Sequence, residues 1–112
     1  MATDSSFMEF LADQMAEAGD ISFRKMFGEY ALYCNGKVVA LVCDNQLFIK
    51  PTPAGRAFIG HITEAPPYPG AKLYFLIEDA FEDRDWIAGL VRATARDLPP
   101  PGAKKKPRRK AT

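Results

Sequence analysis

The sequence has few of the residues that catalytic and metal sites require. It contains one histidine, His61, and two cysteines, Cys34 and Cys43, which do not form a Cys-x-x-Cys spacing. A zinc site draws on several such residues, so no metal site is expected. The sequence also lacks a G-x-G-x-x-G or Walker phosphate motif and a nucleophile elbow. We therefore expect no cofactor and no enzymatic activity.

Long apolar runs are also lacking. No stretch approaches the roughly 18 consecutive apolar residues that indicate a membrane-spanning helix. The opening segment MATDSSFMEF has acids at Asp4 and Glu9 and lacks the basic region that begins a secretory signal. These absences predict a cytoplasmic protein that does not enter a membrane.

Charge is unevenly distributed along the chain, although the net charge is only +1. Without the basic residues of segment 104–110, nine basic residues face fourteen acidic ones, so the remainder carries about −5. From Pro99 onward the sequence PPPGAKKKPRRKAT has no apolar periodicity. Because such a segment cannot offset the entropy cost of ordering, we predict one domain over residues 1–98 and a disordered basic tail over residues 99–112. The tail's basic residues are Lys104, Lys105, Lys106, Arg108, Arg109 and Lys110.

The centre of the sequence, residues 21–50, predicts an antiparallel β-meander. The dipeptide Asn35-Gly36 stands between two runs of β-branched and aromatic residues, and it favours the type I′ turn that joins two adjacent strands. Asp44-Asn45 marks a second tight turn, which leads into Gln46–Lys50. These two turns fix the expected pairing of the strands on either side.

Helical periodicity and capping signals flank the meander. Ser6-x-x-Glu9 has capping-box spacing, and Thr52-Pro53 resembles an N-cap followed by proline at the first helical position. The predicted fold is α+β and two-layered, an antiparallel sheet with flanking helices in the order α-β-β-β-β-α-β-α. Beyond the meander we expect a helix over residues 6–18 with its apolar stripe on Phe7, Phe10, Leu11, Met15 and Ala18. A short helix should end at Gly60, before a loop over residues 61–70 and an interior strand over residues 72–77. A last helix should be opened by Asp79-x-x-Glu82 and end before Pro99.

The two turns predict which side chains share a face of the sheet. One expected face is uncharged and suited to carry the helices: Ala31, Tyr33, Val38, Ala40, Val42, Leu47 and Ile49. The other is mixed but still rich in apolar residues: Tyr30, Leu32, Cys34, Val39, Leu41, Phe48, Lys37, Gln46 and Lys50. Two interpretations of the mixed face stay open. Another helix or later segments of the chain cover it, or it is a homodimer or partner surface centred on Tyr30, Leu41 and Phe48.

The predicted pairing also separates the two cysteines. It sets Cys34 beside Lys37 and Cys43 opposite Gly28, several residue pairs apart along the ladder. That separation is too great for a disulfide. We therefore expect two reduced thiols.

Two groups of basic residues are candidates for nucleic-acid contact. Arg24 and Lys25 flank aromatic residues, so they would contact phosphates while Phe23 or Phe27 stacks on bases. The alternative is that these charges protect an exposed sheet edge. The six cations of the tail would bind phosphates without reading sequence, or they only solubilise the terminus.

The meander resembles the N-terminal domain of the TfoX/Sxy family of bacterial competence regulators. The similarity covers about residues 7–96 and rests on Arg24-Lys25-Met26-Phe27-Gly28, Tyr30, Tyr33, Asn35-Gly36-Lys37, Leu47-Phe48-Ile49-Lys50, Tyr74 and Glu78. The resemblance implies a two-layer α+β domain with helices mainly on one face. It also implies a role in transcription, in the best-known members as a coactivator with the cyclic AMP receptor protein. The longer regulators carry a second, helical domain, whereas this sequence continues as a basic segment.

Together these features give two functional hypotheses. The first is a non-enzymatic regulatory or adaptor domain that contacts a protein partner, such as the transcription machinery, or a second copy of itself. Its contact residues would be Tyr30, Leu41, Phe48 and Lys50. The second is a nucleic-acid-binding module that uses the basic tail together with Arg24 and Lys25.

Overall fold

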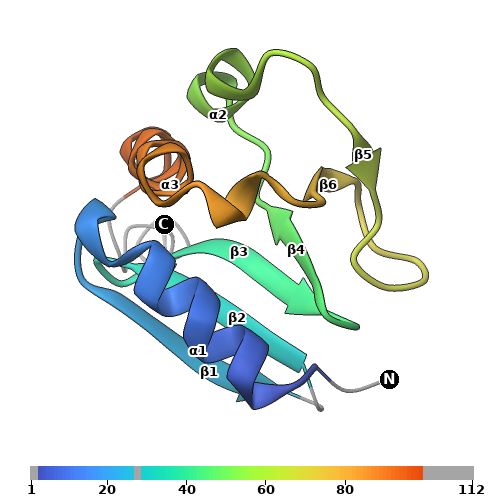
Figure 1. The fold of residues 1–112 in the computed structure, drawn as a ribbon. Coiled ribbons are helices and arrows are strands. Elements are labelled where there is room, and N and C mark those ends of the chain that lie inside the picture. Colours follow the sequence, from blue (N-terminus) through green and yellow to red (C-terminus); the bar gives the residue numbers. More distant parts are fainter. Residues whose placement is uncertain (1–2, 27–28, 100–112) are drawn as a thin grey trace, which may run out of the picture.

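A computed structural model describes residues 3–26 and 29–99 of the chain. These residues form one antiparallel sheet with helices packed against it (Figure 1). The predicted α+β class and the predicted order of elements are confirmed. Along the chain the elements are α1 (Ser5–Gln14), η1 (Ala16–Ala18), β1 (Ile21–Met26), β2 (Glu29–Cys34), β3 (Lys37–Cys43), β4 (Gln46–Ile49), α2 (Pro53–Ile59), β5 (Glu64–Ala65), β6 (Tyr74–Ile77), η2 (Ala80–Glu82) and α3 (Arg84–Asp97).

The described strands form a six-stranded sheet in the order β1-β2-β3-β4-β6-β5. Strand β6 lies inside the sheet as predicted, between β4 and β5. The two-residue strand β5 was not predicted, because its surroundings were read as a proline-rich loop. Glu64 pairs with Phe75, and Ala65 pairs with Tyr74. This pairing folds the segment after α2 back beside the sheet.

Both predicted turns are present, and both use left-handed backbone. Asn35 and Gly36 have φ of 54° and 83°, and Asp44 and Asn45 have φ of 53° and 58°. Positive φ at both central positions is the property of a type I′ turn. The pairing of β3 with β4 follows the predicted register along its whole length, from Cys43 opposite Gln46 to Ala40 opposite Ile49.

The predicted register between β2 and β3 is wrong beyond the first two pairs. Tyr33 lies opposite Val38, but Leu32 lies opposite Ala40, so Val39 has no partner of its own. The β-bulge lies on β3, and it places Tyr30, Leu32 and Cys34 of β2 on the helix-covered side, opposite to the prediction. Both Val39 and Ala40 are fully buried. Burying two consecutive residues in the core is incompatible with strict alternation, and the bulge accommodates it.

The bulge changes which residues share a face. Residues opposite one another in antiparallel strands project to the same side. Leu32 therefore shares the helix-covered face with Ala40 and Ile49, and Tyr30 shares it with Val42. Ala31, predicted for the helix-covered face, lies instead opposite Leu41 on the other side.

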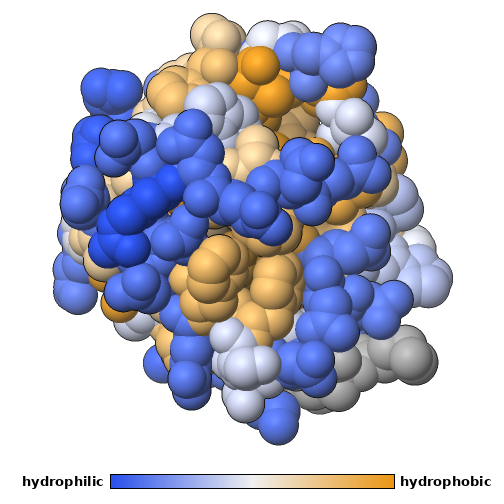
Figure 2. Space-filling model, viewed as in Figure 1, coloured by the Kyte–Doolittle hydropathy of each residue, from blue (hydrophilic) through white to orange (hydrophobic). Residues whose placement is uncertain are grey.

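The helices and one face of the sheet enclose the core (Figure 1). Figure 2, viewed as in Figure 1, shows hydrophilic residues over most of this side of the molecule and a hydrophobic patch near its centre. The sheet contributes Tyr30, Leu32, Cys34, Val39, Ala40, Val42, Leu47, Ile49, Phe75 and Ile77, and the helical segments contribute Met8, Leu11, Met15, Ile87, Leu90, Val91 and Ala95.

The first helix differs from its prediction in its start and in its buried stripe. Its N-cap is Asp4, which makes no side-chain capping bond, so the expected capping box at Ser6 is not used. Met8, Leu11 and Met15 are fully buried, whereas Phe10 is 41% exposed. The stripe is therefore displaced from Phe10 toward Met8. The α-helix ends at Gln14, earlier than the predicted Ala18, and the short η1 follows up to Gly19.

Of the predicted starts of the other two helices, the structure confirms one and contradicts the other. Thr52 caps α2 as predicted, with its Oγ1 accepting a hydrogen bond from the Gly55 amide at 3.0 Å. The last helix does not begin at Asp79. The segment there is the short η2, and Asp83 caps α3 by accepting from the Trp86 amide at 3.1 Å.

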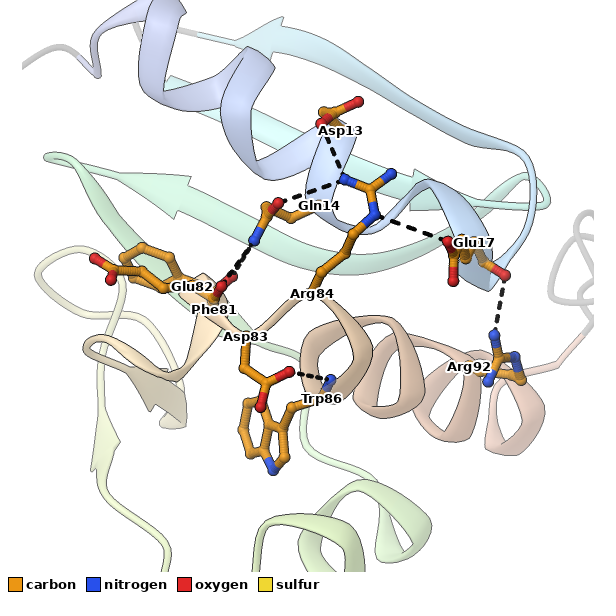
Figure 3. Close-up of polar contacts among 9 residues, drawn as sticks. All are labelled: Asp13, Gln14, Glu17, Phe81, Glu82, Asp83, Arg84, Trp86 and Arg92. Atoms are coloured by element: carbon orange, nitrogen blue, oxygen red, sulfur yellow. Dashed lines mark hydrogen bonds and ion pairs between the residues drawn. The ribbon is translucent and has the colours of Figure 1, made fainter.

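Polar contacts join α1 to the start of α3 (Figure 3). The Gln14 side-chain amide donates to the carbonyl oxygens of Phe81 and Glu82, both at 3.1 Å. Arg84 forms an ion pair with Asp13 at 3.1 Å. Because Gln14 is nearly buried and the ion pair is exposed, we expect the amide contacts to matter more for stability.

Candidate functional site

The face of the sheet opposite the helices carries the candidate site, and we call it the outer face. By register its apolar part includes Ala31, Leu41, Cys43, Phe48, Tyr74 and Leu76, with Met26 and Glu29 at the end of β1 and the start of β2. Ala31, Cys43 and Phe48 are buried, yet none belongs to the core cluster. The outer face is therefore a second apolar surface, separate from the core.

A groove lies on the outer face near the β3–β4 turn. Its larger hollow has a volume of about 670 Å³ and is lined by Met26, Glu29, Tyr30, Leu41, Cys43, Tyr68 and Tyr74. A neighbouring hollow of about 400 Å³ is lined by Glu29, Cys43, Asp44, Gln46, Pro66, Pro67, Tyr68 and Pro69. Three residues line both hollows, namely Glu29, Cys43 and Tyr68. The two hollows therefore form one elongated groove, apolar at one end and more polar at the other.

Glu29 is held rigidly at the junction of the two hollows. Its Oε1 accepts a hydrogen bond from the Thr3 hydroxyl at 2.6 Å and another from the Asp44 amide at 3.0 Å. The Thr3 hydroxyl in turn accepts from the Asn45 amide at 3.2 Å. These bonds tie the carboxylate to the β3–β4 turn, so its charge has a fixed position in the groove.

The groove has negative electrostatic character. Burial, with smaller contributions from the nearby carboxylates of Glu29 and Asp44, raises the pKa of the Cys43 thiol to about 11. Burial also raises the pKa of Tyr74, with smaller contributions from Tyr68 and Cys43. Such a thiol stays protonated at neutral pH, so Cys43 is an apolar wall of the groove rather than a nucleophile. Cys34 is also a free, buried thiol.

The predicted partner residues do not all lie together. Leu41 and Phe48 face one another across β3 and β4 on the outer face, as expected. Phe48 is only 3% exposed, so little of it is available for contact. Lys50 follows the end of β4, and its amide donates to the Val39 carbonyl at 2.9 Å. Neither Phe48 nor Lys50 lines the groove.

Tyr30 does not project to the face on which the prediction placed it. Because of the bulge it projects to the helix-covered side, where its ring packs edge-on against Phe23 at 5.6 Å between ring centroids. It belongs to the core cluster and borders the groove from that position. The predicted surface centred on Tyr30, Leu41 and Phe48 therefore reduces to the part around Leu41.

The predicted nucleic-acid residues are not brought together by the described fold. Arg24 and Lys25 are both exposed on β1, the edge strand, but they project to opposite faces. Arg24 lies opposite Ala31 on the outer side, and Lys25 lies opposite Tyr30 on the helix side. Their positions fit charges that protect a sheet edge. Phe27 and the tail residues Lys104, Lys105, Lys106, Arg108, Arg109 and Lys110 lie outside the described residues.

Sequence reasoning missed most of the groove. Tyr68 stands in a segment that was assigned only as loop, and Tyr74 was assigned only as strand. Glu29 and Met26 come from opposite sides of the β1–β2 connection. The only signal in the sequence was the apolar excess of the meander, which indicated a second apolar face without locating its hollow.

Within residues 3–26 and 29–99, no group of three or more histidine, cysteine, aspartate or glutamate side chains is placed to hold a metal ion. None of the helices in this part of the chain has the length and apolarity needed to cross a membrane.

Comparison with known proteins gives one family and one close relative. The family model of the TfoX N-terminal domain matches residues 13–98. An uncharacterized 12.7 kDa protein from the trpE 5′ region of Spirochaeta aurantia is 44% identical over 105 residues, which cover 94% of this chain and 91% of the relative. The match therefore extends over nearly the full length of both proteins.

Proposed function

Because the chain belongs to the TfoX N-terminal domain family, we propose that it is a non-enzymatic regulatory or adaptor domain that acts through protein–protein contacts. Its partner is a component of the transcription machinery or a second copy of the chain. This role places the protein in the cytoplasm.

The observation that carries this proposal is the groove on the outer face. Half-buried Leu41 and Tyr74 line it, and Tyr68 at its rim is 56% exposed. Tyrosine and methionine are enriched in protein interfaces, where an apolar body and a polar tip suit a surface that is buried only on binding. The site combines a fixed carboxylate with a thiol held protonated, and this chemistry suits binding better than catalysis.

Transcript profiling with matched variants tests the proposal. Deletion of the gene should change the level of specific transcripts, and wild-type protein should restore them. Leu41→Glu places a charge in the groove and should fail to restore them. Phe58→Glu, at a side chain that is 40% exposed on α2, is the control and should restore them. Circular dichroism must show that both variants are folded.

Two results would refute the proposal. If deletion of the gene leaves all transcripts unchanged, the protein has no regulatory role. If folded Leu41→Glu restores the transcripts fully, the groove is not the contact surface.

A second candidate, a nucleic-acid-binding module, is supported by the charge of the tail. Six basic residues lie within residues 104–110 of the sequence. If all six contact phosphates of duplex DNA, the affinity should fall about 10³-fold when salt rises fourfold, because each contact releases counterions. Deletion of residues 99–112 should abolish retention on DNA or RNA at low salt. Unchanged retention after that deletion would exclude the tail as the binding element.

A further inference from the structure

The shape of the groove indicates an extended occupant. The apolar hollow and the polar hollow meet at Glu29, Cys43 and Tyr68, so a ligand that fills both must pass over this junction. A compact small molecule would occupy the larger hollow alone. In an extended peptide segment successive side chains point to opposite sides, whereas alternate side chains, about 7 Å apart, point to the same side. Such a segment can place an apolar group in one hollow and, two residues along, a polar group in the next.

The charge of the groove indicates which polar group fits. Among residues 3–26 and 29–99, those that line the two hollows include the carboxylates Glu29 and Asp44 and no lysine, arginine or histidine. In the part of the chain that the structure describes, ion pairs form between Arg56 and Glu64 and from Arg84 to Asp13 and Glu17, and neither groove carboxylate is in one. Both groove carboxylates also act to raise the pKa of the Cys43 thiol.

The aromatic lining favours the same kind of group. Tyr68 and Tyr74 both line the larger hollow. The face of a tyrosine ring attracts an ammonium or guanidinium group, an interaction that strengthens when the site is desolvated. A carboxylate beside aromatic rings therefore suits a cation on an apolar stem, as in a lysine or arginine side chain.

We propose that the groove binds an extended segment of a protein partner in which an apolar or aromatic residue stands two positions from a lysine or arginine. The apolar side chain fills the hollow formed by Met26, Leu41 and Tyr74, and the cation lies at the junction beside Glu29. This inference rests on the proposed function, since it names the chemistry of the partner that this surface recognises.

The chain's own basic tail is a less suitable occupant within the same molecule. The tail begins after α3, whose C-terminal end lies by the start of β3, where Lys37 Nζ donates to the Ala95 carbonyl at 2.8 Å. The groove lies at the other end of β3, at Cys43, and on the opposite face of the sheet. The helix α3 therefore ends near one end of β3, and the groove lies near the other end.

Peptide binding to the full-length, isotopically labelled protein tests the proposal by NMR. The probe is a capped peptide, Ac-Gly-Phe-Gly-Arg-Gly-NH₂, in which the two side chains point to the same side when the peptide is extended. Its controls replace arginine by citrulline, a neutral group of nearly the same shape, or by glutamate. The arginine peptide should shift the resonances of Leu41, Cys43 and Tyr74 and bind about tenfold more tightly than the citrulline peptide, in line with the strength of a partly desolvated cation–π and charge contact. The glutamate peptide should bind more weakly still.

Glu29→Gln provides the matched variant. The glutamine side-chain oxygen still accepts the bonds from Thr3 and Asp44, so the local structure is retained while the charge is lost. The preference for arginine over citrulline should fall to about threefold or less, because the charge contact at the junction is removed. Glu9→Gln, an exposed acid on α1, is the control and should leave the preference unchanged.

Three outcomes of these titrations would overturn the inference. The arginine and citrulline peptides bind equally, the resonances that shift belong to the β1 edge instead of the groove, or Glu29→Gln keeps the full preference. Each of these is compatible with a positive transcript experiment, which would then leave the outer face as a contact surface for a partner of different chemistry. A peptide of the chain's own residues 99–112 could also bind the groove more tightly than the arginine probe. That result would indicate a second copy of the chain as the partner and would contradict the proposal.

Discussion

Replacement of Leu32 by alanine should destabilise the domain much more than the same replacement at Leu41. Leu32 is 0% exposed and lies in the core cluster. Its truncation removes buried methyl groups and leaves a cavity, which costs about 3 kcal/mol for a leucine of this kind. Leu41 is half-buried on the outer face and lines the groove, so its truncation should cost about 1 kcal/mol.

The comparison is sensitive to the bulge. Without it, Leu32 would project with Leu41 to the outer face, and the two substitutions would have similar costs. With it, Leu32 packs opposite Ala40 in the core. The free-energy difference of about 2 kcal/mol between the variants should correspond to a melting temperature lower by roughly 10 °C for Leu32→Ala than for Leu41→Ala.

Equilibrium unfolding in urea measures the difference, with the fluorescence of Trp86 as the probe, because it is the single tryptophan of the chain and packs at 5.6 Å from the Phe58 ring. The slopes of the transitions must agree between the variants, so that the midpoints report stability alone. Equal destabilisation by the two substitutions, or a larger effect at Leu41, would refute the assignment of faces made here.

Three further predictions concern contacts away from the bulge. Gln14→Ala should lower the free energy of unfolding by about 1–3 kcal/mol, because the carbonyls of Phe81 and Glu82 lose their donor, whereas exposed Glu9→Ala should change it by less than about 0.5 kcal/mol in the same urea assay. Lys37→Met should cost about 1 kcal/mol, since it removes the bond to the Ala95 carbonyl and a cation near the C-terminus of α3. Amide exchange should rise in the last turn of that helix, and unchanged protection would contradict this role. The Cys43 thiol loses its proton more easily in the unfolded chain, where its pKa is near 9.0, than in the folded protein, where it is about 11. Stability should therefore decline as pH rises from about 9 to about 11, and Cys43→Ala should reduce that decline in urea titrations at successive pH values.

Local chemistry made the turns, most strands and one helix cap predictable. Asn35-Gly36 and Asp44-Asn45 tolerate positive φ, and each fixes the pairing of the residues next to it regardless of the rest of the chain. Thr52 followed by proline identified the start of α2 in the same way. The family could also be identified from the sequence, because its motif lies in these locally determined strands.

The bulge and the groove depended on the tertiary structure. Whether Val39 forms a regular pair or a bulge depends on how the helices pack over Leu32 and Ala40, and no neighbouring residue in the sequence carries that information. The position of Phe10 outside the core has the same origin.

The sequence by itself determined the antiparallel meander, its helices and its second apolar surface, because these follow from turn preferences and periodicity. Only the tertiary structure decided that Tyr30 lies inward and that Glu29, Tyr68 and Tyr74 meet around one hollow. Those residues come from segments far apart in the chain, and packing brings them together.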